Sequence, residues 1–154
     1  MCGLRSELKE KEGRELAMEV KRIQFQVHGD DRGQLIALEV LKDVPFEIKR
    51  VYYMYDTKEN VRRGFHSHKK LEQILVCVSG TCKLLLDDGK EKRVVNLEKP
   101  YEGVYIGANI WREMFDFSED AVLMVLASEH YNENDYIRNY NEFLRSIGKN
   151  TEKE

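Results

Sequence analysis

The chain is poor in cysteine, has no long apolar run and carries no large excess of either charge. Its 25 Lys and Arg nearly balance 28 Asp and Glu, for a formal net charge of -3, which gives no general reason to expect nucleic acid or an anionic membrane as a partner. No apolar run approaches the length of a membrane span, and the first residues lack the apolar block of a signal peptide. The three cysteines, Cys2, Cys77 and Cys82, are an odd number without an export signal, so we expect reduced thiols and a cytoplasmic protein.

The composition that remains is typical of one globular domain. Of the 154 residues, 42% are hydrophobic and 34% are charged, which allows a sizeable core and argues against disorder. Residues 1–19 are rich in Glu, Lys and Arg, and we expect a poorly ordered extension there. The domain is predicted over residues 20–148, followed by a short tail at 149–154.

From Val20 onward, short apolar segments alternate with turn residues. We expect strands at residues 23–27, 34–40, 48–55, 72–78, 81–86, 92–97, 103–106, 111–117 and 121–127. The pair at 72–78 and 81–86 predicts a tight hairpin across Ser79-Gly80. Because no helix separates these strands, the pattern predicts an all-β sandwich or barrel and not a parallel α/β sheet.

The period of the pattern changes near the C-terminus. Four aromatic or apolar residues recur there at helical spacing: Tyr136, Tyr140, Phe143 and Ile147. Asn134 is the expected N-cap, and Gly148 ends the pattern. One C-terminal helix is therefore predicted to pack on the β body, with Tyr131, Tyr136 and Tyr140 in that packing.

Two histidines at alternate positions, in Gly64-Phe65-His66-Ser67-His68, are the most informative feature of the chain. Residues two apart in a strand project from the same face, so His66 and His68 should point into one cavity. Such a pair indicates either a metal site or two proton-handling groups. A pair of purely structural histidines on a barrel wall is the third interpretation.

The spacing of His66, His68 and Glu72, followed by Gly80, resembles the first motif of the cupin superfamily of small jelly-roll barrels. In metal-binding cupins, a histidine from a second motif supplies the fourth ligand, and this chain offers Arg112 there. A guanidinium is always protonated and has no lone pair for a metal. We therefore expect no metal, with a three-ligand site of the two histidines and Glu72 as the open alternative.

The other interpretation uses the imidazoles themselves. A histidine with its ordinary pKa of about 6.5 accepts and returns protons at neutral pH, which suits the movement of protons around a carbonyl group. We expect no cofactor. Arginines in the chain would match a phosphorylated or nucleotide-linked substrate through paired hydrogen bonds: they are Arg32, Arg50, Arg62, Arg63 and Arg112.

Longer segments carry a closer resemblance. They lie at residues 49–53, 63–73, 122–128 and 134–138. In these segments the chain resembles the WxcM-like sugar ketoisomerases, the dTDP-4-keto-6-deoxyglucose 3,4-ketoisomerases of bacterial glycan pathways. The resemblance implies a metal-independent cupin jelly roll and a homodimer with exchanged N-terminal strands. It also implies a keto-sugar product that an aminotransferase converts to a 3-amino-3,6-dideoxy sugar.

The resemblance implies roles for individual residues as well. His66 would remove the proton at C3 of the 4-keto sugar to give an enediol, which is reprotonated at C4. His68 and Tyr52 would move a hydroxyl proton or stabilise the developing oxyanion. Arg63 would hold the pyrophosphate.

Other positions are less sharply defined. Arg32-Gly33 resembles the branch of the family that forms dTDP-3-keto-6-deoxygalactose. Many members have a histidine where this chain has Arg112. Which residues transfer the protons in this chain is therefore left open. Gln73 and Glu113 are equally compatible with pocket and surface positions, and Glu72 either orients His68 or pairs with Arg50 or Lys70.

Several alternative functions remain open at the level of the sequence. The product could have the gluco configuration at C4, or the enzyme could be a related dTDP-sugar 3,5-epimerase, which needs an acid on the opposite face of the sugar. A different class of function is a ligand-binding cupin without activity, or a metal-dependent dioxygenase.

Overall fold

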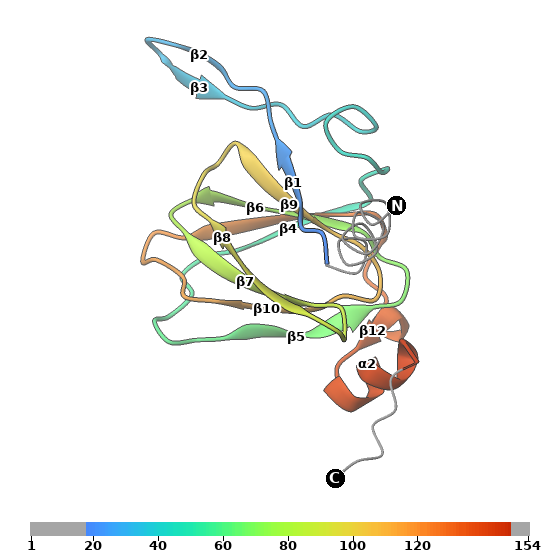
Figure 1. The fold of residues 1–154 in the computed structure, drawn as a ribbon. Helices are drawn as coiled ribbons and strands as arrows, with labels where there is room; N and C mark the ends of the chain where they lie inside the picture. The colour runs from blue at the N-terminus through green and yellow to red at the C-terminus, as the bar shows by residue number, and fades with distance from the viewer. Residues whose placement is uncertain (1–17, 149–154) are drawn as a thin grey trace, which may run out of the picture.

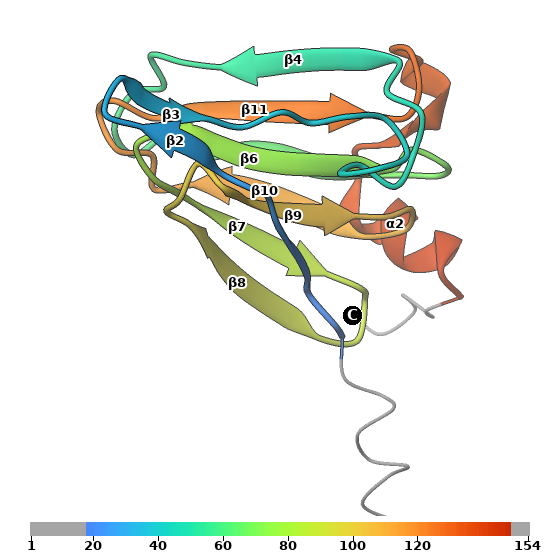
Figure 2. The ribbon, with the colours of Figure 1, turned by 90° about the horizontal axis from the view of Figure 1, so that it is seen from above.

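Two antiparallel sheets lie face to face and form the body of the protein (Figures 1 and 2). The structure, a computed structural model, describes residues 18–148. The predicted tail at 149–154 and most of the predicted extension at 1–19 fall outside these residues. The strand order is β1-β9-β6-β11-β4 in one sheet and β12-β5-β10-β7-β8 in the other. The all-β jelly-roll class predicted from the sequence is confirmed.

The elements have the following bounds. The first sheet contains β1 (Lys21–Gln24), β9 (Glu102–Ile106), β6 (Gln73–Ser79), β11 (Val122–Ala127) and β4 (Arg50–Met54). The second contains β12 (Tyr136–Ile137), β5 (Arg63–His68), β10 (Trp111–Phe115), β7 (Cys82–Asp87) and β8 (Lys92–Leu97). A separate hairpin of β2 (His28–Asp30) and β3 (Gly33–Leu35) projects from the body (Figure 1). The helical elements are η1 (Glu133–Asp135) and α2 (Tyr140–Ser146).

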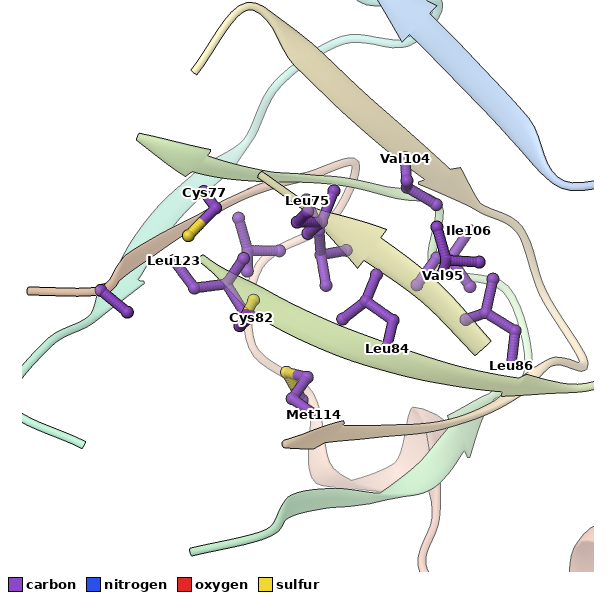
Figure 3. Close-up of a cluster of buried hydrophobic side chains, with 13 residues drawn as sticks. Leu75, Cys77, Cys82, Leu84, Leu86, Val95, Val104, Ile106, Met114 and Leu123 are labelled. Carbon is purple, nitrogen blue, oxygen red and sulfur yellow. The ribbon is translucent and has the colours of Figure 1, made fainter. Parts of the chain in front are cut away.

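Apolar side chains from both sheets fill the space between them (Figure 3). Alternate residues of each strand point inward, as in Leu84 and Leu86 of β7, which are 0% and 4% exposed. Cys77 and Cys82 are also part of this core, so both thiols are small buried apolar groups, as the sequence predicted. Met114 anchors β10 in this core, and β10, which carries Arg112, pairs with β5, which carries the histidines.

The segment between β3 and β4 covers the outer face of the first sheet. A strand was expected over residues 34–40, but β3 ends at Leu35. The apolar side chains that follow pack on the sheet instead of pairing along its edge. They are Ile36, Leu38, Val44, Phe46 and Ile48, against Phe25, Ile74, Val76 and Leu126.

The hairpin predicted across Ser79-Gly80 is wrong. Strand β6 pairs with β9 and β11, whereas β7 pairs with β8 and β10, so the turn carries the chain from one sheet to the other. Gly80 has φ +63°, and a Cβ there would lie 2.3 Å from Ser118 Oγ. The glycine therefore marks a tight corner between sheets, which has the same local signal as a hairpin turn.

The C-terminal helix is shorter than predicted. It begins after Asn139, whose side chain accepts a hydrogen bond from the backbone of Glu142, and not after Asn134. Tyr136 and Ile137 instead form β12, paired with His68 and Ser67 of β5. Tyr140 and Phe143 pack on Trp111 of β10, so the helix lies on the β body as predicted. In the described part of the chain, no helix has the length and apolar character needed to cross a membrane.

Candidate active site

A bulge in β5 sets the direction of both histidines. In the pairing of β5 with β10, Arg112 lies opposite His66 and Glu113 lies opposite Gly64, so Phe65 is an extra residue without a partner. Gly64 and Phe65 both have positive φ, at 94° and 55°. After this bulge, His66, Ser67 and His68 are all buried.

Gly64→Ala is expected to destabilise the bulge. A Cβ at Gly64 would lie 2.8 Å from the carbonyl oxygen of Arg112, at a φ that side chains rarely adopt. We expect a loss of about 1–3 kcal/mol in the free energy of unfolding, measured by urea denaturation. Gly107→Ala is the control, because its Cβ would meet only the Tyr105 ring at 3.5 Å. Equal stability of both variants would contradict a strained bulge.

The two imidazoles lie together beneath an aromatic ring. The ring centroids of His66 and His68 are 4.9 Å apart with nearly perpendicular planes, and Tyr136 lies 5.0 Å from the first and 4.3 Å from the second. The sequence placed Tyr136 in helix packing, which is corrected here: pairing of β12 with β5 brings its ring to the histidines.

Asp135 is the carboxylate that holds His68. Its Oδ2 lies 3.2 Å from His68 Nδ1, and its two oxygens accept hydrogen bonds from the backbone N–H groups of Lys70 and Leu71. A carboxylate only accepts, so Nδ1 carries the proton and Nε2 of neutral His68 keeps its lone pair. Glu72, expected to orient His68 or to pair with a nearby cation, instead accepts a hydrogen bond from the Tyr105 hydroxyl. Sequence reasoning missed Asp135, although it lies in the matched segment 134–138.

A buried hydrogen-bond chain runs beside the histidines. Arg112 Nη1 donates to Gln73 Oε1 at 2.6 Å, and Gln73 Nε2 donates to the Tyr52 hydroxyl oxygen at 2.9 Å. Arg112 and Gln73 are each 1% exposed. Arg112 Nη2 also donates to the Ile110 carbonyl oxygen at 2.9 Å. Burial lowers the pKa of Arg112 to about 10, so it remains a cation at neutral pH.

Burial and the Arg112 charge keep both histidines neutral. Burial first, and Arg112 second, lower the pKa of His66 to about 4 and that of His68 to about 2. Among the described residues, His66 Nδ1 and His68 Nε2 are buried polar atoms without a hydrogen-bond partner. The site therefore offers basic nitrogens that are free to take a proton.

The low pKa of His66 has a consequence for the pH profile. The imidazole acts as a base only when neutral, so the acid limb of kcat/KM should lie near 4 and not near the ordinary histidine value of about 6.5. We expect nearly full activity at about pH 5.5, with circular dichroism confirming that the protein is folded there. Half-maximal activity near pH 6.5 would contradict the depressed pKa.

A pocket of about 370 Å³ opens onto His66. Arg50, Arg63 and Arg138 line it together with Tyr52 and Tyr136. Arg50 also lines an adjacent pocket of about 490 Å³ that reaches His68. Arg138, which the sequence had not singled out, lies over the Tyr136 ring at 4.4 Å and pairs with Glu133. The mouth of the site is thus strongly cationic.

Several predicted binding residues do not line this pocket: Gln73 and Arg112 are buried beside the histidines, and Arg32, Gly33, Arg62 and Glu113 lie farther from it. Arg32 and Gly33 are in the projecting β2–β3 hairpin (Figure 1), where Arg32 pairs with Asp30. Glu113 pairs with Arg62 and accepts a hydrogen bond from Trp111 Nε1. It does not line the pocket of His66.

The metal alternative finds little support in the ligand geometry. Within residues 18–148, no three His, Cys, Asp or Glu side chains converge in a way that could hold a metal ion. Glu72, the candidate third ligand, is engaged by Tyr105. The groups around the histidines are the Arg112 cation, the Asp135 carboxylate on His68 and the Tyr136 ring.

Comparison with known proteins assigns the chain to a family. A family model described as "FdtA: WxcM-like, C-terminal" matches residues 18–148. The chain belongs to this WxcM-like family. A curated relative, the TDP-4-oxo-6-deoxy-alpha-D-glucose-3,4-oxoisomerase of Aneurinibacillus thermoaerophilus, is 54% identical over 138 residues, which are 89% of this chain and 99% of the relative. The resemblance read from the sequence is therefore confirmed.

Solved structures of 3,4-ketoisomerases share the fold over nearly their whole length. The WlaRB TDP-quinovose 3,4-ketoisomerase of Campylobacter jejuni is 53% identical, with a TM-score of 0.80 over 84% of this chain and 99% of its own. The 3,4-ketoisomerase QdtA of Thermoanaerobacterium thermosaccharolyticum is 43% identical, with a TM-score of 0.84 over 90% and 100%. That structure is a His-to-Asn variant in complex with TDP-4-keto-6-deoxyglucose.

Proposed function

We propose that this WxcM-like protein is a 3,4-ketoisomerase that converts TDP-4-keto-6-deoxyglucose to the 3-keto isomer without a metal. The observation that carries the proposal is the pair of neutral imidazoles beside Tyr52, beneath a cationic pocket mouth. The names of the two relatives with 54% and 53% identity support the reaction. We propose the cytoplasm as the place of action, in keeping with the free thiols of Cys77 and Cys82.

His66 would act as the base. It removes the proton from C3, the electron pair of that bond forms the C3–C4 double bond, and the C4 oxygen gains a proton to give an enediol. The C3 hydroxyl then loses its proton as C4 is protonated, which leaves the ketone at C3. Tyr52 lines the pocket of His66, and His68 lines the adjacent pocket and contacts the His66 ring, so both are candidates to exchange the hydroxyl protons.

The arginines at the mouth would bind the diphosphate. Arg63 and Arg50 were singled out from the sequence, and Arg138 joins them in the structure. The Arg50 guanidinium lies over the rings of Tyr52 and Tyr131, at 5.1 and 5.7 Å from their centroids. A guanidinium held in this way presents its N–H groups to phosphate oxygens in a fixed orientation.

We also propose a homodimer in which the β2–β3 hairpin of one protomer reaches its partner. The hairpin projects from the body (Figure 1), and Leu35 on it is 59% exposed. Strand β4 is an edge of its sheet and exposes Val51 and Tyr53, a surface suited to pairing with another chain. Such an exchange would bring Arg32 and Gly33 to a site. Sedimentation that gives only monomer at micromolar concentration would contradict it.

For the product we propose the galacto configuration, TDP-3-keto-6-deoxygalactose, on the basis of Arg32-Gly33. The gluco configuration is the second candidate, because WlaRB is named for quinovose, the 6-deoxyglucose sugar. An enzyme of this kind would supply 3-keto sugars for amination and bacterial glycan assembly, such as O-antigen or S-layer glycan.

The test is a reaction of chelator-treated protein with TDP-4-keto-6-deoxyglucose, followed by proton NMR. We expect a 3-keto product, and the coupling of its C4 proton distinguishes the galacto from the gluco configuration. Activity that appears only after a divalent metal is added would contradict the metal-free chemistry. Binding of TDP without turnover would favour the ligand-binding cupin.

A further inference from the structure

We infer that Arg112 and Gln73 are positioning residues that fix the Tyr52 hydroxyl as a hydrogen-bond donor to the substrate oxygen on which negative charge develops. This role rests on the proposed ketoisomerase function and specifies how its oxyanion is stabilised. It is carried by the direction of two buried hydrogen bonds and by a buried charge that has no carboxylate partner.

The direction of the chain follows from the chemistry of arginine. A guanidinium has five N–H donors and no acceptor, so the Gln73 atom that faces Arg112 must be the carbonyl oxygen. That contact is 2.6 Å long and lies in the fully buried core of the site. The amide NH₂ of Gln73 therefore faces Tyr52, 2.9 Å from its oxygen. A glutamine between two neutral partners could flip, whereas this one cannot.

Tyr52 must accept from Gln73, and its own hydrogen is consequently left for another acceptor. The side chain lines the pocket that opens onto His66. Burial raises the pKa of the Tyr52 phenol above its ordinary value, so the proton stays on the oxygen at neutral pH. A neutral phenol that accepts from an amide and points its hydrogen into the pocket is a preorganised oxyanion donor.

The positive charge of Arg112 also favours negative charge on a substrate oxygen beside Tyr52. Its side chain is 1% exposed, yet no ion pair found among residues 18–148 includes it. Its acceptors are neutral: Gln73 Oε1 and the carbonyl oxygens of Ile110 and Gly107. A buried cation without a counter-ion is unfavourable. An enediolate formed beside Tyr52 would supply the missing negative charge.

Gln73→Glu reverses the chain while preserving the shape of the side chain. The introduced carboxylate would accept from Arg112 with one oxygen and from the Tyr52 hydroxyl with the other, which withdraws the hydrogen from the pocket. We expect kcat to fall by about 100-fold or more, as on removal of one oxyanion donor. KM and the affinity for TDP, measured by calorimetry, should stay within about threefold, because the nucleotide binds through other residues.

A double-mutant cycle with Tyr52→Phe tests whether the effect passes through Tyr52. In the Tyr52→Phe background, Gln73→Glu should change kcat by no more than about twofold, since the group that it disturbs is absent. An equal fall in both backgrounds would overturn the proposal and assign the effect to the added negative charge beside Arg112 or to packing. If thermal melting shows that Gln73→Glu does not fold, the same cycle is run with Gln73→Met, which removes the amide donor without adding an acid. For Gln73→Met we expect a fall of about tenfold that disappears in the Tyr52→Phe background.

The wild-type rate separates this inference from the proposed function. No turnover by the wild-type protein would contradict the ketoisomerase assignment itself. Normal wild-type turnover together with an unchanged rate for the Gln73 variants would contradict only the hydrogen-bond chain.

Discussion

His66→Asn should lower kcat by about two orders of magnitude or more, because the reaction loses its base. Asparagine occupies similar space and keeps a polar group beside Arg112, but it cannot take a proton from carbon at neutral pH. Burial and Arg112 keep His66 neutral, so the native residue can accept a proton without first losing one.

The affinity for TDP is the control for this variant. The arginines that line the pocket are untouched by the change, so the dissociation constant of TDP measured by calorimetry should remain within about threefold. Near-normal turnover by His66→Asn would refute the assignment of the base. Loss of both turnover and TDP binding, in a folded protein, would assign His66 to binding instead.

Asp135→Asn should produce the second large effect. The carboxylate accepts from His68 Nδ1 and from two backbone N–H groups. An asparagine has one acceptor oxygen, and the two backbone donors compete for it. Its NH₂ would then face His68 and force the proton onto Nε2, which removes the free lone pair. We expect kcat to fall by about 10²-fold or more.

Asp88→Asn is a matched control for this substitution. The Asp88 carboxylate also accepts from two backbone N–H groups, those of Lys90 and Glu91, but it contacts no histidine. It should lose some stability and keep its activity. The ¹⁵N chemical shifts of the His68 ring should report a change of tautomer in Asp135→Asn alone. Unchanged ring shifts and unchanged kcat would contradict the role of Asp135.

Much of the site could be predicted from the sequence, because the residues concerned are close together in the chain. Alternation along one strand places His66 and His68 on a common face, and it does so even though the bulge at Phe65 interrupts the pairing with β10. The replacement of a ligand histidine by Arg112 is visible without a structure, because arginine cannot bind a metal. The all-β sandwich or barrel follows from the regular spacing of strands and turns, and the family resemblance narrows it to a jelly roll.

The parts that the sequence could not supply depend on contacts between distant segments. Asp135 reaches His68 only because β12 pairs with β5. Tyr136 was assigned to the helix because it precedes Tyr140 by one helical turn, and a short strand before a helix leaves the same pattern. The corner at Gly80 resembles a hairpin turn for a similar reason: the residue requirements of both are the same, and only the strand partners differ.

The most direct test of the central claim is an NMR time course of TDP-4-keto-6-deoxyglucose with the wild-type protein in D₂O. The acid–base account predicts loss of the C3 proton signal, appearance of a ketone at C3 and retention of the C5 proton. Exchange at C3 and C5 with the ketone still at C4 would contradict it and indicate an epimerase.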